Sequence, residues 1–396
     1  MPIPTPFHER IAPLCTSMFY KDWAGYYSVC SYETCHEREY YAFRHATGMI
    51  DVTPLYKYDV TGPDAAAYLS RVMTRNIAKL KPGRVTYCCW CDDEGKVIDD
   101  GTVTCMEEDV YRVTAAEPSW SWFQRFTRGY RVEIKDISNS VAALSLQGPT
   151  SRDLLKSATA GGLGKLRFFR MKRASIDGVD VIITRTGYTG DLGYEVWVEN
   201  EHALKVWDAL MAHGKAYGLE PCGLDAMDVT RVEAGFIMNG VDYFSAHHAL
   251  LESQKSTPFE LGLGGTVDLE RDPFVGQAAL IAEKQQGSAW AFAGIEMDWP
   301  GFEAICDRYG LPPHVASGAW RGGIPLFNVA GNQIGYATSG AWSPTLKKNL
   351  SLATIEAAYG QPGTNLQMEV TVEYHRHKTA AKVVPLPFYN PPRKRS

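Results

Sequence analysis

The chain has 396 residues, of which 45% are hydrophobic and 21% are charged, and its formal net charge is -5. This composition is typical of a soluble globular protein with two or three domains, and the negative charge argues against nucleic acid as a partner. No apolar run approaches the length of a membrane span, and the Pro-rich start has no signal-peptide core. We therefore expect a cytoplasmic protein with no membrane partner. The nine cysteines have no regular spacing, which suits a reducing compartment.

The first third of the chain begins with an arm and continues as a mixture of strands and helices. Residues 1–35 are rich in Pro, Tyr and Cys and predict an irregular arm laid over other elements. Helical spacing over Glu37–His45 is followed by strand-like alternation over Met49–Val60. Pro63 then suits the first turn of a helix that runs through Leu69.

The stretch from Thr86 to Val103 reads as two strands joined by an Asp-Glu-Gly turn. Strict alternation places Ile98, Asp100 and Thr102 on one face, and Val97, Asp99 and Val103 on the other. One of the two adjacent carboxylates then points inward, where it is costly unless it is paired, hydrogen-bonded or functional. Cys88, Cys89 and Cys91 lack a second pair of ligands at zinc spacing, so we interpret them as core or pocket-lining thiols and predict no metal site.

The middle of the chain alternates strands with helices and contains two glycine-rich stretches. Gly161–Lys165 lacks the Ser or Thr of a phosphate loop, and the glycines after Arg185 lie three apart instead of forming a dinucleotide fingerprint. Helices are predicted from Asn200 to Met211 and from Leu224 to Ala234. From about residue 286 to the end, short strands broken by Gly and Pro predict a separate small all-β domain. Its terminal Arg393-Lys394-Arg395 is predicted to be a solvated basic tail.

Four phrases in order, Arg185–Glu195, Arg231–Gly235, Thr257–Gly264 and Thr338–Asn349, resemble one family. It is the tetrahydrofolate-dependent aminomethyltransferase family, which comprises the T-protein of the glycine cleavage system, folate-dependent demethylases, and the folate domains of dimethylglycine dehydrogenase and sarcosine oxidase. The resemblance runs from about Gly48 to Phe388.

This resemblance implies an α+β fold of three domains arranged as a cloverleaf around a central folate channel, with a small C-terminal β-barrel. The implied domains are residues 1–50 with 141–285, residues 51–140 inserted between them, and residues 286–396. The family's catalytic aspartate is the second of an Asp-Asp pair, here Asp100, with Asp99 as its structural neighbour. A fixed carboxylate there stabilises positive charge at N5 of tetrahydrofolate and accepts its proton.

The resemblance also assigns folate-binding residues. Glu195 matches the acceptor for the pterin N–H groups, for which one carboxylate makes two bonds. Tyr111 matches a family aromatic near the folate, and Tyr87, Tyr188 and Arg231 are weaker candidates. The alternative for the tyrosines is core packing, and for Arg231 a salt bridge with Asp228 or Glu233.

Three departures concern the donor of the one-carbon unit. A folate-site arginine of the T-protein is Met227 here, a basic residue at the start of the barrel is Phe292, and an Asn is Ala115. Residues 51–55 resemble the folate domains of methylamine-oxidising enzymes more than the T-protein. Tyr26, Tyr27, Tyr32, Tyr40 and Tyr41 suggest an aromatic wall for a methylated donor.

The sequence therefore predicts a one-carbon transferase that acts on tetrahydrofolate. A demethylase acting on a small methylated donor is the favoured form. The alternative is a glycine-cleavage aminomethyltransferase whose donor arrives on a lipoylated carrier protein. A non-catalytic folate-binding protein is disfavoured, because Asp100 is present and the cysteine of that paralogue's motif is absent.

Overall fold

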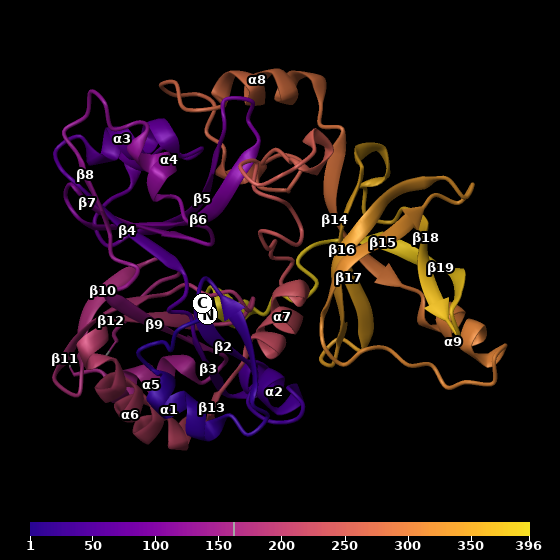
Figure 1. The fold of residues 1–396 in the computed structure, drawn as a ribbon, viewed down its shortest axis with the longest axis horizontal. Coiled ribbons are helices and arrows are strands. Elements are labelled where there is room, and N and C mark those ends of the chain that lie inside the picture. The colour runs from indigo at the N-terminus through magenta and orange to yellow at the C-terminus, as the bar shows by residue number, and fades with distance from the viewer. Residues whose placement is uncertain (161–162) are drawn as a thin grey trace.

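A computed structural model describes residues 1–160 and 163–396, so Gly161 and Gly162 of the glycine run lie outside the described residues. Its described strands form three main β-units: a six-stranded sheet, a five-stranded sheet and a closed barrel. Figure 1 shows them as three lobes around a central region. The predicted mixed fold with three lobes and a C-terminal barrel is confirmed.

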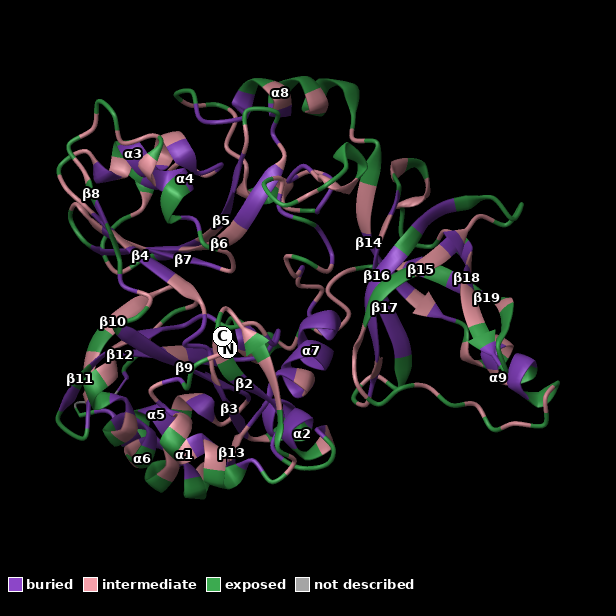
Figure 2. Ribbon diagram, viewed as in Figure 1, coloured by how far each residue is buried: buried purple, intermediate pink, exposed green. Residues whose placement is uncertain are grey.

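The six-stranded sheet is built from two separate parts of the sequence. Its strands, in the order β10-β11-β12-β9-β3-β13, are β3 (Thr47–Asp51), β9 (Val141–Gln147), β10 (Met171–Ile176), β11 (Val179–Thr184), β12 (Gly193–Glu199) and β13 (Leu219–Pro221). Every residue of β9 is buried, and Figure 2 shows this strand inside the lobe. Successive β9 side chains enter two different cores, because successive side chains of a strand point to opposite faces.

Helices cover both faces of this sheet. One face packs against α1 (His8–Ile11), α5 (Ser151–Ala158) and α6 (Ala203–Gly214). Part of the other face packs against α2 (Glu37–His45) and α7 (Leu224–Glu233). The helix α7 also contacts the barrel strands β16 and β17, so it lies between two lobes (Figure 1).

The five-stranded sheet has the order β5-β6-β7-β4-β8 and is antiparallel throughout. Its strands are β4 (Tyr56–Thr61), β5 (Val85–Cys91), β6 (Val97–Glu107), β7 (Val110–Ala115) and β8 (Glu133–Asp136). One face forms a core with α3 (Ala65–Val72) and α4 (Trp120–Gln124). Cys88 lies in that core, and Cys89 and Cys91 are buried on the opposite side.

A β-bulge in the β5–β6 hairpin changes the predicted alternation near the turn. The register shifts between Trp90 and Cys91, so Ile98 enters the α3–α4 core while Val97 packs with Cys89. The prediction that Ile98 shares a face with Asp100 is therefore wrong. A bulge adds an unpaired residue and reverses the alternation beyond it. Asp99 and Asp100 lie on the regular side of the bulge and are paired with Trp90 and Cys89, respectively.

The C-terminal unit is a closed barrel in the order β14-β17-β16-β15-β18-β19. Its elements are β14 (Trp290–Met297), α9 (Trp299–Asp307), β15 (Trp320–Phe327), β16 (Gln333–Ser343), β17 (Lys348–Glu356), β18 (Asn365–Val372) and β19 (His375–Val384). Closure leaves no free sheet edge, which is how short strands with Gly and Pro form a stable unit.

The N-terminal arm is more regular than predicted. It contains the hairpin of β1 (Phe19–Trp23) and β2 (Tyr26–Ser31), in which Trp23 pairs with Tyr26. The two intervening residues, Ala24 and Gly25, both have positive φ, as a two-residue hairpin turn requires.

The segment that leads into the barrel contacts the five-stranded unit. Residues 245–280, predicted to belong with residues 141–285, bond to the five-stranded unit: Ala246 N–H donates to Val97 O at 2.8 Å, and Val275 N–H donates to Arg71 O at 3.0 Å. The helix α8 (Gln277–Gln286) packs beside that unit, where Leu280 meets Gly95. The domain boundaries themselves stay a prediction.

The basic tail is only partly solvated: Arg395 is exposed as predicted, but Arg393 and Lys394 are not. Arg393 Nε donates to Asp191 Oδ1 at 2.7 Å, and Lys394 is buried against the ring of Phe236. The tail binds because the six-stranded unit offers it a buried carboxylate and an aromatic face. Among the described residues, no helix combines the length and apolar character needed to cross a bilayer.

Candidate active site

A cleft separates the six-stranded sheet from the five-stranded sheet, and both sheets turn polar side chains toward it. The five-stranded sheet contributes the uncovered face of β6 and β7, and the six-stranded sheet contributes β11 and β12. The lining residues are Val85, Thr102, Thr104, Met106, Arg112 and Thr114 on one side, and Ile182, Thr184, Glu195 and Trp197 on the other. Asp100 shares a face of β6 with Thr102.

Asp100 is held by two phenols. Tyr87 donates to Oδ2 at 2.7 Å, and Tyr243 donates to Oδ1 at 2.5 Å. Burial raises the pKa of Asp100 above its ordinary value, and the two phenol donors act in the opposite direction. The structure thus brings Tyr87 and Asp100 together, and the two phenols fix the orientation of the Asp100 carboxylate.

Asp99 is fully buried and leaves β6 on the opposite face from Asp100, yet the carboxyl groups of both residues contact the phenol of Tyr243. Its Oδ2 accepts from the backbone N–H groups of Ala116 and Glu117 at 3.0 and 2.9 Å. Its Oδ1 accepts from Asn239 Nδ2 at 3.0 Å. Burial, followed by the adjacent charge of Asp100, raises the pKa of Asp99 well above its usual range.

Glu195 lies on β12 in the opposite wall of the cleft. Its Oε2 accepts from the hydroxyls of Thr186 at 2.9 Å and Thr184 at 3.4 Å. Its Oε1 has no hydrogen-bond partner in the described part of the chain, and burial raises the pKa of the carboxyl. A half-buried carboxylate with one oxygen uncommitted is suited to accept N–H donors from a ligand.

Tyr188 and Arg231 lie near this cleft but are committed to other contacts. The hydroxyl of Tyr188 donates to Ile237 O, and its ring stacks on Phe236 with centroids 5.6 Å apart. Arg231 is wholly buried: Nε donates to Asp228 Oδ1 at 2.7 Å, and Nη1 donates to Asp242 Oδ2 at 2.5 Å. The salt-bridge interpretation of Arg231 therefore holds for Asp228 and not for Glu233.

Arg231 is connected to Asp100 through the segment 236–243. Asp242, its partner, also accepts from Thr338 and Ser339 of β16 at 2.5 and 2.7 Å. The next residue, Tyr243, bonds to Asp100. This segment thus joins α7, the barrel and the carboxylate of Asp100.

Tyr111 lies on the opposite face of β7 from the cleft-lining Arg112 and Thr114. It is buried in the core with α3 and α4. Its predicted contact with folate stays a prediction. Tyr111 faces the core of the five-stranded unit, whereas Glu195 lines the cleft.

The aromatic wall proposed for a methylated donor does not form. Tyr32 and Tyr40 are buried in two different cores, while Tyr27 and Tyr41 are exposed. Tyr26 donates to Asn139 on the surface. These tyrosines are distributed over β2, the residue that follows it and α2, which face different neighbours, so they do not enclose one ligand.

Tyr243, Asn239 and Asp242 are site residues that the sequence did not predict. They come from an irregular segment after α7, where no periodicity marks which side chains point inward. The one available signal was the adjacency of this segment to the Arg231–Gly235 phrase.

Comparisons with known proteins agree with this architecture. Residues 14–271 match the model described as GCVT N-terminal domain, and residues 310–390 match the glycine cleavage T-protein C-terminal barrel domain. An aminomethyltransferase of Caldanaerobacter subterraneus is 35% identical over 353 residues, which are 88% of this chain and 87% of that protein.

This chain belongs to the glycine cleavage T-protein family. It is therefore a one-carbon group transferase, and its cofactor is tetrahydrofolate. A trimethylamine-oxide aldolase of Ruegeria pomeroyi is 32% identical over 99% of this chain but only 47% of its own length. The crystal structure of glycine cleavage system aminomethyltransferase T from Bartonella henselae superposes with a TM-score of 0.82 at 23% identity, covering 98% of this chain and 99% of that one, which shows the shared fold.

Proposed function

We propose that this family member transfers an aminomethyl-derived one-carbon unit to tetrahydrofolate in the cleft between the two sheets. The observations that support the proposal are that Asp100, held by two phenols, shares a face of β6 with the cleft-lining Thr102, and that Glu195, which has an uncommitted oxygen, lines the facing wall. Tetrahydrofolate supplies the N5 amine that accepts the unit.

In this proposal Glu195 binds the pterin and Asp100 assists the reaction at N5. Glu195 Oε1 would hold the N–H edge of the pterin, since a carboxylate accepts two such bonds. Asp100 would lie beside N5 as a fixed negative charge, stabilise the positive charge that develops there, and accept the departing proton. Tyr87 and Tyr243 keep Asp100 from rotating, so that its charge needs no reorganisation during the reaction.

The relatives and the scattered tyrosines reverse the order of the two donors predicted from the sequence. Aminomethyltransferases cover nearly the whole chain and nearly their own whole length, as with one of Geobacillus that is 34% identical over 93% of this chain and 94% of itself. This supports an aminomethyl donor on a lipoylated carrier.

A small methylated donor is the second candidate, and two observations favour it. The match to trimethylamine-oxide aldolase spans almost the whole chain. In addition, Met227 and Phe292 fill apolar packing sites where the T-protein has basic residues.

The test is incubation with tetrahydrofolate and either aminomethylated carrier protein or a panel of methylated amines, sulfonium compounds and methoxy-aromatics. The folate product is identified by mass. We expect methylene-tetrahydrofolate and ammonia with the carrier, formed about two to four decades more slowly by Asp100→Asn. Methyl-tetrahydrofolate from a panel compound, with no reaction of the carrier, would establish the second candidate instead.

A further inference from the structure

Asp99, Tyr243 and Asp100 form a chain of oxygen contacts that the catalytic role of Asp100 alone does not require. The phenol oxygen of Tyr243 lies 2.5 Å from Asp100 Oδ1 and 3.4 Å from Asp99 Oδ1. A phenol carries a single proton, so it donates to one carboxyl group at a time. The shorter contact assigns that proton to Asp100 and leaves the phenol oxygen free to accept from the side of Asp99.

Asp99 is fully buried and has no ion pair among the described residues, whereas Asp100 is half-buried, so a charge is costlier on Asp99. The N–H donors to Asp99 oppose this effect, because they favour the ionised form. Oδ2 accepts two backbone N–H groups, from Ala116 and Glu117, as a carbonyl oxygen does. Oδ1 accepts from Asn239 Nδ2 at 3.0 Å, and a proton on Oδ1 would face the phenol oxygen of Tyr243 at 3.4 Å, which is longer than an ordinary O–H···O hydrogen bond.

If Asp99 and Asp100 were both ionised, no positive charge in the described part of the chain would offset their mutual repulsion. No ion pair to Asp99 or Asp100 occurs among the residues that the structure describes, and those residues contain no cluster able to hold a metal. Like charges at adjacent buried sites push one carboxyl to the neutral form. The second phenol, Tyr87, makes Asp100 the better place for the charge.

We propose that the Asp99–Tyr243–Asp100 chain holds one proton at neutral pH, that Asp99 carries it, and that Asp99 and Tyr243 are positioning residues that keep Asp100 ionised. The positioning role of Asp99 and Tyr243 rests on the proposed function of Asp100. The location of the proton can be measured without turnover. The titratable groups that face the pair are Tyr243 from the segment after α7, Tyr87 and Cys89 from β5, and Tyr188.

The location of the proton is tested by NMR on protein labelled with ¹³C at the aspartate carboxyl carbons. We expect one carboxyl resonance at the neutral-acid position at pH 7 in the wild type. The Asp100→Asn variant should retain it, because burial is the largest cause that keeps Asp99 protonated. The Asp99→Asn variant should lose it. Any other pattern, including loss in both variants or retention only in Asp99→Asn, overturns the proposal.

The role of Tyr243 is tested by the pH profile of turnover. Tyr243→Phe removes one donor to the Asp100 carboxylate, so the acidic limb should move to higher pH by about one to two units, the equivalent of one hydrogen bond to a charged group. Tyr68→Phe is the matched control, because its phenol donates to Phe123 O in the core on the other side of the sheet. It should leave the limb in place.

If Tyr243→Phe is folded and the acidic limb of its pH–rate profile does not move, the proposed link between Asp99 and Asp100 through Tyr243 is overturned. Undiminished turnover in Asp100→Asn is a different outcome. It would reject the proposed function and leave the NMR assignment of the proton intact, so the two failures can be told apart.

Discussion

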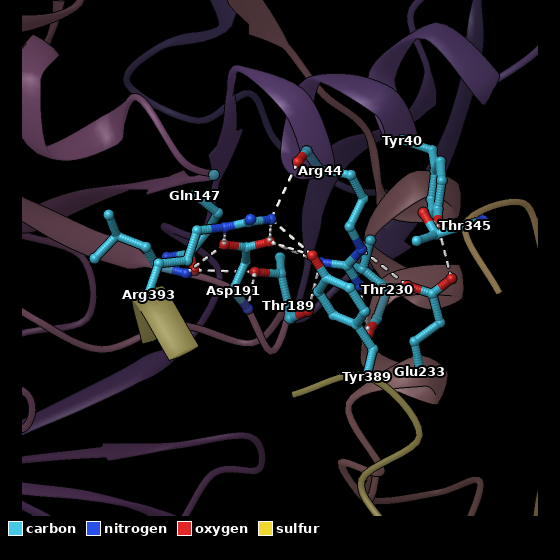
Figure 3. A network of polar contacts seen from close by, with 12 residues as sticks. Tyr40, Arg44, Gln147, Thr189, Asp191, Thr230, Glu233, Thr345, Tyr389 and Arg393 are labelled. Carbon is cyan, nitrogen blue, oxygen red and sulfur yellow. Dashed lines mark hydrogen bonds and ion pairs between the residues drawn. The ribbon is translucent and has the colours of Figure 1, made fainter. Parts of the chain in front are cut away.

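Arg44 on α2 and Glu233 at the end of α7 form an ion pair that is almost completely shielded from solvent (Figure 3). Arg44 Nε donates to Glu233 Oε2 at 2.9 Å, and Nη1 donates to Thr189 O at 3.0 Å. The ring of Tyr389 from the C-terminal tail covers the guanidinium at 4.3 Å.

Glu233 extends this contact to the barrel. Its Oε1 accepts from Tyr40 at 2.6 Å and from Ser343 of β16 at 2.5 Å. Three of the phrases that carry the family resemblance therefore meet at one buried point: the stretches after Arg185, Arg231 and Thr338. These phrases therefore have a structural role, because they join two lobes and the C-terminal tail, as well as any role in the active site.

Removing one partner of this pair should destabilise the protein strongly. Arg44→Met leaves Glu233 as an uncompensated buried charge, which costs about 3–5 kcal/mol of unfolding free energy. Chemical denaturation measures the loss. The double variant Arg44→Met/Glu233→Met should lose less than the sum of the single variants, because it buries no unpaired charge. Asp153→Asn, which breaks an exposed pair with Lys156, is the control and should be almost silent. Equal small losses in all variants would contradict the assignment.

Asp100→Asn should lower turnover by about two to four decades while folate affinity is largely retained. The substitution keeps the shape of the side chain but removes the negative charge from the face of β6 that turns toward the cleft. Steady-state kinetics with folate affinity measured separately distinguishes the two effects. Asp99→Asn should be much milder, because an amide replaces a neutral acid without loss of charge. Equal losses in both variants would show that the two aspartates do not have different roles.

Strand alternation was sufficient to predict that Asp99 and Asp100 point in different directions. It failed at the neighbouring residues Ile98 and Val97, because a bulge depends on the partner strand and leaves no mark in the sequence. Tyr243 reaches Asp100 from 143 residues further along the chain. No spacing rule predicts such a contact, since an irregular segment has no period.

The aromatic wall failed for a related reason. Tyr32 and Tyr40 are close in sequence, yet one follows a hairpin strand and the other lies on a helix, and each enters a different core. Composition indicates that aromatic side chains are plentiful. It does not indicate whether they converge.

Glu195→Ala should weaken folate binding by about 1–3 kcal/mol, because a pterin donor edge loses its acceptor in a partly desolvated cleft. Calorimetric titration of folate into the variant measures this. Glu199→Ala, at the exposed end of the same strand, is the matched control and should bind folate as the wild type does. An unchanged dissociation constant for Glu195→Ala would return this residue to a structural role.

Folate affinity should also depend on pH through Glu195. Burial raises the pKa of this carboxyl above the ordinary value of about 4.3, and the hydroxyls of Thr186 and Thr184 oppose the shift. The ionised form accepts N–H donors more strongly than the neutral acid, so affinity should be highest above the raised pKa and should fall as the pH falls through it. The stability of the ligand-free protein should depend on pH in the opposite direction. A carboxyl that is protonated more readily in the folded state contributes stability below its ordinary pKa, and this stability is lost as the pH rises through the raised pKa.

Glu195→Gln should abolish the pH dependence of both folate affinity and stability. Titrations of wild type and Glu195→Gln in parallel, over a pH range of about 5 to 8, isolate the contribution of this residue, because the ligand's own ionisation cancels in the ratio of the two dissociation constants. A constant ratio across the range would mean that Glu195 does not meet the pterin in its ionised form.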